Sequence, residues 1–205
     1  ATVDAEAYYR EKCAAIIRTR EKTAERLERM RHFLSEHEMS AEKKDADALH
    51  YALLFADTDA KLCRRLMQSL KPSRDELSGV ESVQKFGNAA ESLAGNSPVY
   101  EVKLLMKAGG DGFPRKVAVY KYSVGLLDAE TAAEVIRTAE DLRESGACVR
   151  LSDLRVTGSD LMLLGFAGPK IGLVLNTLLD RVMREELEND RDVLLRAAEK
   201  LASQN

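Results

Sequence analysis

The stretch from residue 151 to residue 198 constrains the fold most, because start and stop signals for helices follow one another there at short intervals. Two short helical segments have polar starts, Ser152-Asp153 and Ser159-Asp160. Gly165 and Gly168 predict a turn at the end of the second segment. Pro169 then suits the first position of a long helix, because its missing N–H would have no partner there anyway.

The end of the same stretch predicts a last helix. Asn189 is of a residue type that caps helix starts, and Asp190 and Asp192 would lie in the positive first turn. Apolar residues between these signals recur at helical spacing, with no alternating pattern of the kind that strands show. The stretch therefore predicts a series of packed helices.

The rest of the chain follows the same pattern of apolar residues at helical spacing, interrupted by Gly, Pro and Asx breaks. We expect helices over 1–34, 46–56, 76–94, 99–108 and 128–145, one ending at residue 70, and one restarting at Pro114. Residues 35–45 are polar and favour a loop. The predicted fold class is all-α, an irregular array of many helices.

Composition agrees with this expectation and excludes several classes of protein. The 205 residues are 45% apolar and 32% charged and include no Trp, which is typical of a soluble, helix-rich protein. Cys13, Cys63 and Cys148 are far apart and odd in number, match no metal-ligand spacing and favour a reducing compartment. No signal peptide and no apolar run of membrane length is found.

Charge is unevenly distributed along a chain whose net charge is only −3. From Lys61 to Lys121, 11 Lys or Arg face 6 Asp or Glu, a local charge of +5. From Gly125 to the end, 10 face 15, a local charge of −5. A basic middle could bind a phosphate backbone on one face, but ordinary solvated helix faces explain the same pattern.

An ordered set of residues in the last third resembles the C-terminal part of bacterial CCA-adding tRNA nucleotidyltransferases, grouped with the poly(A) polymerase family. The set comprises Asp153, Leu154, Val156, Gly158, Asp160, Leu161, Gly165, Gly168, Pro169, Ile171, Gly172, Leu175, Leu178, Leu179, Val182, Asn189, Leu194 and Leu195. Upstream, residues 50–76 resemble the family's neck helices, which end in a Leu-Lys-x-Ser turn, and residues 102–122 resemble its body helices.

The resemblance implies a division into a neck-like region, 1–95, and a body- and tail-like region, 96–205. It implies a role in tRNA 3′ end processing: holding the acceptor and TΨC arms by shape, through phosphate and 2′-hydroxyl groups. The family adds nucleotides with a mixed-sheet head that binds Mg²⁺ and CTP or ATP, and no strand-rich segment here matches it. We therefore expect no catalytic residue, metal or cofactor in this chain, a cytoplasmic location, tRNA as partner and no membrane.

Five cations are the candidate RNA contacts. Lys71 and Arg74 lie beside the free N–H groups of a helix start, Arg115 and Lys116 occupy a first turn where they oppose the helix dipole, and Lys170 follows Pro169 at another helix start. For Lys71 and Arg74 the alternative is a plain helix turn with solvated charges, and the resemblance favours phosphate contact; for Lys170, solvation explains the residue equally well.

Two sets of residues imitate catalytic motifs. Asp57 and Asp59 form an Asp-x-Asp, but their helical flanks would make the side chains diverge, so helix capping is the favoured interpretation. His32, His37 and His50 are scattered, which argues against a metal-dependent hydrolase. The segment 140–143, Glu-Asp-Leu-Arg, resembles a base-reading motif with its arginine one residue early, and is interpreted as a solvated face.

A different class of function is the alternative. The long amphipathic helix at the N-terminus could pair with a copy of itself, which would make the chain a helical protein–protein or dimerisation module without RNA contact. Binding to RNA would weaken steeply with salt, whereas pairing through apolar stripes would not.

Overall fold

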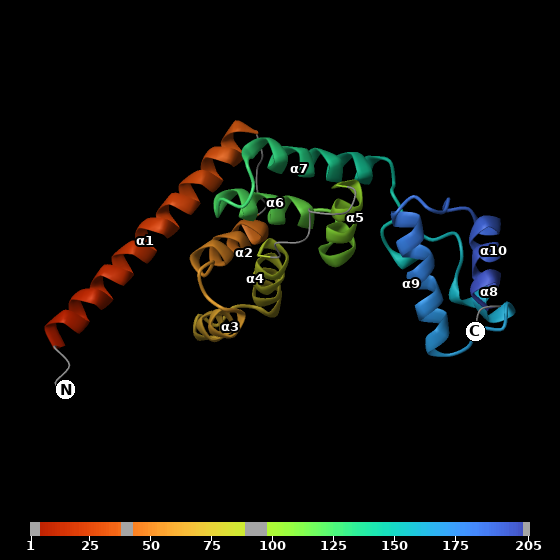
Figure 1. Ribbon diagram of the computed structural model, residues 1–205, viewed down its shortest axis with the longest axis horizontal. Coiled ribbons are helices and arrows are strands. Elements are labelled where there is room, and N and C mark those ends of the chain that lie inside the picture. The colour runs from red at the N-terminus through yellow and green to blue at the C-terminus, as the bar shows by residue number, and fades with distance from the viewer. Residues whose placement is uncertain (1–4, 38–42, 89–97, 203–205) are drawn as a thin grey trace. The chain divides into compact units, whose positions relative to one another are not determined.

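The computed structural model describes residues 5–37, 43–88 and 98–202, and every regular element within them is a helix (Figure 1). The elements are α1 Ala5–Glu36, α2 Lys43–Leu54, α3 Ala60–Ser69, α4 Arg74–Gly87, α5 Pro98–Gly109, α6 Phe113–Ser123, α7 Ala129–Glu144, the 3-10 turn η1 Leu151–Asp153, α8 Gly158–Leu163, α9 Pro169–Met183 and α10 Arg191–Ala202. The all-α prediction is confirmed, and the described residues contain no mixed-sheet head. None of these helices is both long and apolar enough to cross a bilayer.

The chain divides into two compact units that interleave in sequence. Unit 1 comprises Ala1–Glu91 and Pro114–Ile136, and unit 2 comprises Ser92–Phe113 and Arg137–Asn205. The expected boundary at residue 95 separates a neck-like region from a body- and tail-like region of the family, which are not the same as these compact units. That boundary stays a prediction.

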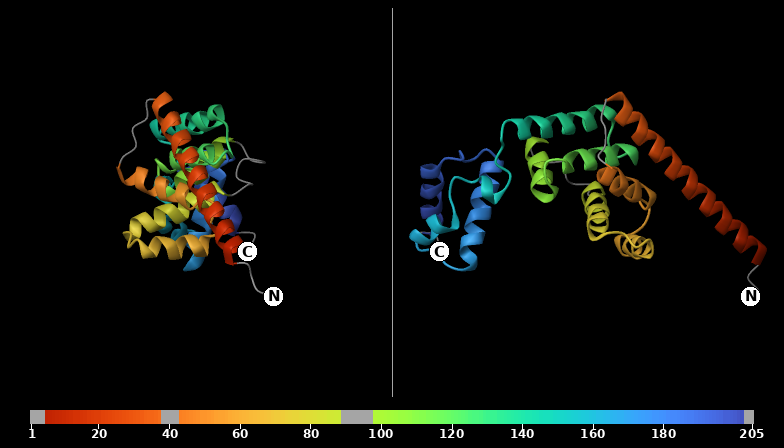
Figure 2. Two further views of the ribbon diagram at one scale, coloured as in Figure 1. Left: turned by 90° about the vertical axis from the view of Figure 1, so that its left-hand side faces the viewer. Right: turned by 180° about the vertical axis from the view of Figure 1, so that it is seen from behind.

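Unit 1 is built around α2 and α4, which lie side by side (Figures 1 and 2). Its core includes Phe33 from α1, Leu53 from α2 and Tyr120 from α6, all with no exposed surface. Gly87, the last residue of α4, allows a close approach, because a Cβ there would lie 2.3 Å from Cδ1 of Tyr120. Ile17 on α1, by contrast, is 55% exposed.

Unit 2 has its own apolar core between α8, α9 and α10. Leu161, Leu178 and Leu194 are fully buried there. Tyr100 brings α5 into the same core, and its hydroxyl donates to Asp180 on α9. Burying aliphatic side chains of this size contributes about 1.5–3 kcal/mol each, so this cluster is the main stabilising element of the unit.

Several predicted helix caps are confirmed because capping depends on local chemistry. Asp59, one of the two aspartates expected to cap a helix, accepts through Oδ1 from the Leu62 amide at 2.8 Å. Asp128, where the helix over 128–145 was expected to begin, accepts through Oδ1 from the Thr131 amide at 2.7 Å. Pro169 is the first residue of α9. In each case the residue type at the helix start is one that can bond, or does without, the free amide at that position.

The predicted cap Asn189 is wrong, and the helix expected to start at Ser159-Asp160 begins one residue earlier, at Gly158. Thr157 caps α8, in a capping box with Asp160. Asp190, not Asn189, caps α10, because its Oδ1 accepts from the amides of Asp192 and Val193 at 3.0 and 3.1 Å. Both differences arise because two capping residue types lie close together in the sequence, and only the backbone geometry selects between them.

Helix ends also differ from the expected ones. α1 continues to Glu36 and α2 begins at Lys43, so the polar segment expected as a loop is shorter than 35–45, and residues 38–42 lie outside the described ones. α4 ends at Gly87, whereas a helix to residue 94 was expected; residues 89–97 lie outside the described part.

Candidate nucleic-acid interface

The turn between α3 and α4 presents two of the five candidate cations to solvent. Lys71 and Arg74 are both exposed and lie in unit 1. Lys71 adopts φ 54°, in the left-handed region that costs a residue with a side chain about 1–2 kcal/mol. The Lys71 amide donates to the Gln68 carbonyl at 3.1 Å, so this left-handed residue ends α3, as such residues commonly end helices.

The start of α4 beside this turn is already partly satisfied. Ser73 Oγ accepts from the Glu76 amide at 3.2 Å, and Glu76 accepts in return from the Ser73 amide at 2.7 Å. The Ser73 hydrogen bonds lower the pKa of the Glu76 carboxyl, which therefore stays charged at neutral pH. The side chains of Lys71 and Arg74, rather than this capped helix start, are the anion-binding groups that the turn offers.

The second pair of candidates lies at the start of α6. Arg115 and Lys116 are half-buried, and each has an interaction partner within the protein. Both belong to unit 1, as do Lys71 and Arg74.

Lys170, the fifth candidate, lies in unit 2 and is exposed at the second position of α9. The residue before the helix, Gly168, has φ 56° and offers no side-chain cap. Pro169 has no N–H, and the Ile171 amide donates to the Gly168 carbonyl at 3.2 Å, so the side chain of Lys170 is the anion-binding group that this helix start offers.

The family-like motif of the last third mostly builds unit 2. Asp153 Oδ2 accepts from the amides of Val149 and Arg150 at 3.1 and 2.8 Å. The side chain of Asn189 then accepts from the Arg155 amide at 3.0 Å and donates to the Asp153 carbonyl at 2.8 Å. Asn189 thus joins the segment after η1 to the start of α10, a bridge that pattern analysis missed.

Asp160 and Gly158, two further motif residues, have equally structural roles. Asp160 pairs with Arg191 on α10, and this bond, together with those from Thr157, holds the pKa of the Asp160 carboxyl well below its usual range. A Cβ on Gly158 would lie 3.2 Å from Cγ2 of Ile171, so glycine permits the close packing of α8 on α9. These motif residues therefore stabilise the fold of unit 2.

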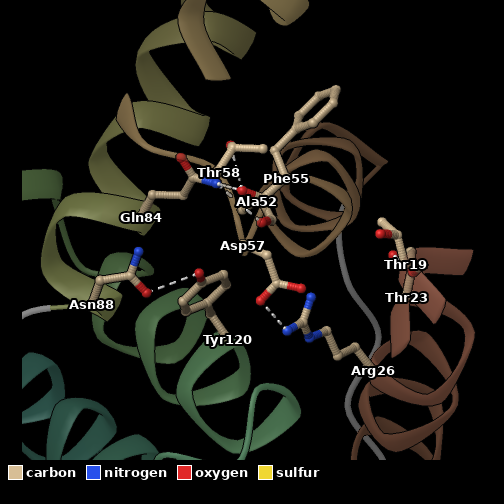
Figure 3. A network of polar contacts seen from close by, with 10 residues as sticks. All are labelled: Thr19, Thr23, Arg26, Ala52, Phe55, Asp57, Thr58, Gln84, Asn88 and Tyr120. Atoms are coloured by element: carbon tan, nitrogen blue, oxygen red, sulfur yellow. Dashed lines mark hydrogen bonds and ion pairs between the residues drawn. The ribbon is translucent and has the colours of Figure 1, made fainter. Parts of the chain in front are cut away.

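The Asp-x-Asp pair does not form a metal site. Asp59 caps α3, whereas Asp57 pairs with Arg26 of α1 at 2.7 Å (Figure 3). The hydrogen bond from Arg26 lowers the pKa of the Asp57 carboxyl. Among the residues that the structure describes, no three His, Cys, Asp or Glu side chains gather as metal ligands would.

The other imitations of catalytic motifs are also explained by the surroundings. His32 pairs with Glu36 at 3.0 Å, and the ring of His37 lies 4.4 Å from that of Phe33. In the segment 140–143 the acidic residues and Arg143 are exposed, as expected for a solvated face.

Three cations that sequence analysis did not single out share one pocket of unit 1. Lys61 and Arg64 on α3 and Lys85 on α4 line it together. Lys61 and Lys85 are 24 residues apart in sequence, so only the packing of α3 on α4 reveals the cluster.

One comparison with known proteins gives a match. The model of the family described as tRNA nucleotidyltransferase domain 2 matches residues 42–198, about three quarters of the chain. No curated protein and no solved structure matches.

Proposed function

Because the chain belongs to the tRNA nucleotidyltransferase domain 2 family, we propose that it holds tRNA by the acceptor and TΨC arms during 3′ end processing. Binding is through phosphate and 2′-hydroxyl groups, with little reading of bases. The chemistry of CCA addition, with Mg²⁺ and CTP or ATP, belongs in this proposal to a separate catalytic head. The setting that we infer is the cytoplasm.

The observation that carries the proposal, beside the family, is the exposed turn with Lys71 and Arg74. Lys71 keeps a long cationic side chain at a backbone position where glycine would be less strained. Arg74 extends from the first residue of α4, three residues away. Phosphates along an RNA strand are spaced so that neighbouring cations on one turn can contact successive groups.

The test is binding to a tRNA that lacks its 3′ end, titrated across salt. Reversing the charge of Lys71 and Arg74 should weaken binding and reduce the slope of log K against log salt by about 1.4–1.8, for two lost phosphate contacts. Charge reversal of Arg143, exposed on α7, is the matched control and should change binding less. Unchanged binding and slope in the double variant would refute the role of this turn.

Two substitutions at Lys71 separate charge from strain. Lys71→Ala removes the charge but keeps a Cβ at φ 54°, whereas Lys71→Gly removes both. Both should weaken tRNA binding alike, and only the glycine variant should be more stable, by up to about 1 kcal/mol. A glycine variant that binds like the parent chain would show that the lysine is not an RNA contact.

The roles of the other three cations are tested separately. Lys170→Glu should weaken binding without a loss of stability, because the side chain is exposed. Arg115 and Lys116 have partners in the protein, so their variants need a measurement of unfolding beside the binding assay. A variant that loses stability and binding together would not support a phosphate contact.

A second candidate function is self-association through α1. Ile17, a large apolar residue, is 55% exposed on this 32-residue helix. If α1 pairs with a second copy, sedimentation should show a dimer that Ile17→Asp dissociates. A monomer across micromolar concentrations would remove this candidate.

A further inference from the structure

A pocket of unit 1 lies between the first half of α3 and the second half of α4. Its volume is about 740 Å³, within the range of small-molecule sites. Thr58 and Ala60 lie at its α3 end, and Asn88, the residue after α4, lies at its α4 end. All the lining residues belong to unit 1, so the pocket is formed within one compact body.

The charge of the lining favours an anion. Lys61, Arg64 and Lys85 face one carboxylate, Glu81. Arg64 lies 3.5 Å from Glu81, which leaves an excess of two positive charges. Lys61 is also in the first turn of α3, a helix whose start is capped by the Asp59 carboxylate. A phosphate group in the pocket would neutralise this local excess.

Two amides on the α4 side add hydrogen-bonding groups of opposite kinds. Gln84 Nε2 donates to the carbonyls of Ala52 and Phe55 at 3.3 and 2.9 Å, so the group that its amide can still offer is an acceptor (Figure 3). Asn88 Oδ1 accepts from the Tyr120 hydroxyl at 3.0 Å, so its amide can still offer donors.

The spacing of Gln84 and Asn88 along the chain allows their side-chain amides to contact the same ligand. Gln84 and Asn88 are four residues apart at the end of α4, and residues at this spacing are neighbours on a helix surface. Gln84 is only 7% exposed and is held by its two backbone bonds, so its amide is pre-oriented. An acceptor beside a donor matches the edge of a nucleobase, on which both kinds of group alternate.

We propose that this pocket binds a phosphorylated nucleoside, with the phosphate on Lys61, Arg64 and Lys85 and the base against Gln84 and Asn88. The aliphatic parts of the three cationic side chains, with Ala60, supply apolar walls for the sugar and the ring. The ligand is either a free nucleotide or one unpaired nucleotide of an RNA strand, since both present the same groups.

In this proposal the pocket binds the nucleotide and does not catalyse metal-dependent phosphoryl transfer. Glu81 is the single carboxylate of the lining, and Arg64 already pairs with it. Two-metal phosphoryl transfer needs more than one free carboxylate, so the donor set fits a phosphate held by cations.

The first test is calorimetric titration of the whole chain with AMP and CMP, beside adenosine and inorganic phosphate as partial ligands. A nucleotide should bind at least about tenfold more tightly than either part alone, as expected when charged hydrogen bonds and base contacts combine. Lys61→Glu with Arg64→Glu should weaken nucleotide binding at least about tenfold.

Arg65→Glu is the matched control, because Arg65 is the exposed neighbour of Arg64 on α3 and does not line the pocket. Binding of the Arg65 variant should stay close to that of the parent chain. No nucleotide binding at millimolar concentration, or equal losses in both variants, would overturn the proposal. Inorganic phosphate that binds as tightly as AMP would overturn its nucleoside part.

A competition experiment distinguishes a free nucleotide from a nucleotide of an RNA strand as the ligand. It also tests this pocket independently of the proposed tRNA contact at Lys71 and Arg74. If the ligand is a nucleotide of RNA, a short single-stranded oligonucleotide should compete with AMP, and the pocket variant should lose both. If it is a free nucleotide, the oligonucleotide should not compete. The variant reversed at Lys71 and Arg74 should keep AMP binding in either case, so loss of tRNA binding and loss of this site are distinguishable.

Discussion

The bridge made by Asn189 can be tested against the cap that its sequence position suggests. Its side chain accepts from the Arg155 amide at 3.0 Å and donates to the Asp153 carbonyl at 2.8 Å. One intramolecular hydrogen bond contributes about 0.5–1.5 kcal/mol, so Asn189→Ala should destabilise unit 2 by about 1–3 kcal/mol. The lower half of that range is expected, because water can reach the exposed Arg155 amide.

Asn189→Asp distinguishes the two interpretations. At a helix cap, Asp and Asn are nearly equivalent, so the substitution would be almost neutral. In the bridge, a carboxylate still accepts from Arg155 but cannot donate to the Asp153 carbonyl, and two oxygens would then face each other. The aspartate variant should therefore be no more stable than the alanine variant.

The assay combines urea unfolding followed by circular dichroism with hydrogen exchange at the Arg155 amide. Both variants should lower the midpoint, and the alanine variant should lose protection at that amide. Asn176→Ala is the control, because Asn176 is exposed on α9 and donates only to the Gly172 carbonyl of its own helix. An aspartate variant as stable as the parent chain would refute the bridge.

Three further predictions concern other parts of the fold. Gly87→Ala should lower the free energy of unfolding by about 1–3 kcal/mol, because the added Cβ would overlap the Tyr120 ring. The same change at Gly172, where the added Cβ meets no atom, should stabilise the helix by up to about 1 kcal/mol. Urea unfolding measures both effects. Burial raises the pKa of the Cys148 thiol to about 11, so its alkylation, followed by mass spectrometry, should accelerate near pH 11, and stability should fall above pH 9, where the unfolded thiol ionises first. Lys103→Ala should cost about 1–3 kcal/mol in the unfolding assay, because the buried ammonium donates to a backbone carbonyl at the end of α9.

The residues that could be predicted from sequence are those whose partners are close along the chain. Asp59 and Asp128 each bond an amide three residues away, so residue type and position were enough. Apolar spacing likewise indicated most of the helices. Local chemistry alone therefore accounts for the all-α class.

The residues that were missed have partners far along the chain. Asn189 bonds groups 34 and 36 residues away, and no local pattern distinguishes this bridge from a cap. The pocket cations Lys61 and Lys85 come together only because α3 packs on α4. A basic stretch was visible in the sequence, but which of its charges share a surface depends on tertiary packing.

These contacts separate the motif residues that stabilise the fold from the surface cations that are proposed to bind tRNA. Asp153, Asp160 and Asn189 make their hydrogen bonds inside unit 2, so substitutions there should act first on stability. Lys71 and Arg74 are exposed on a turn, so substitutions there should act first on affinity and on its salt dependence. Asp153, Asp160 and Asn189 are thus not the residues to mutate when tRNA binding is tested, because loss of binding in such a variant would report an altered fold.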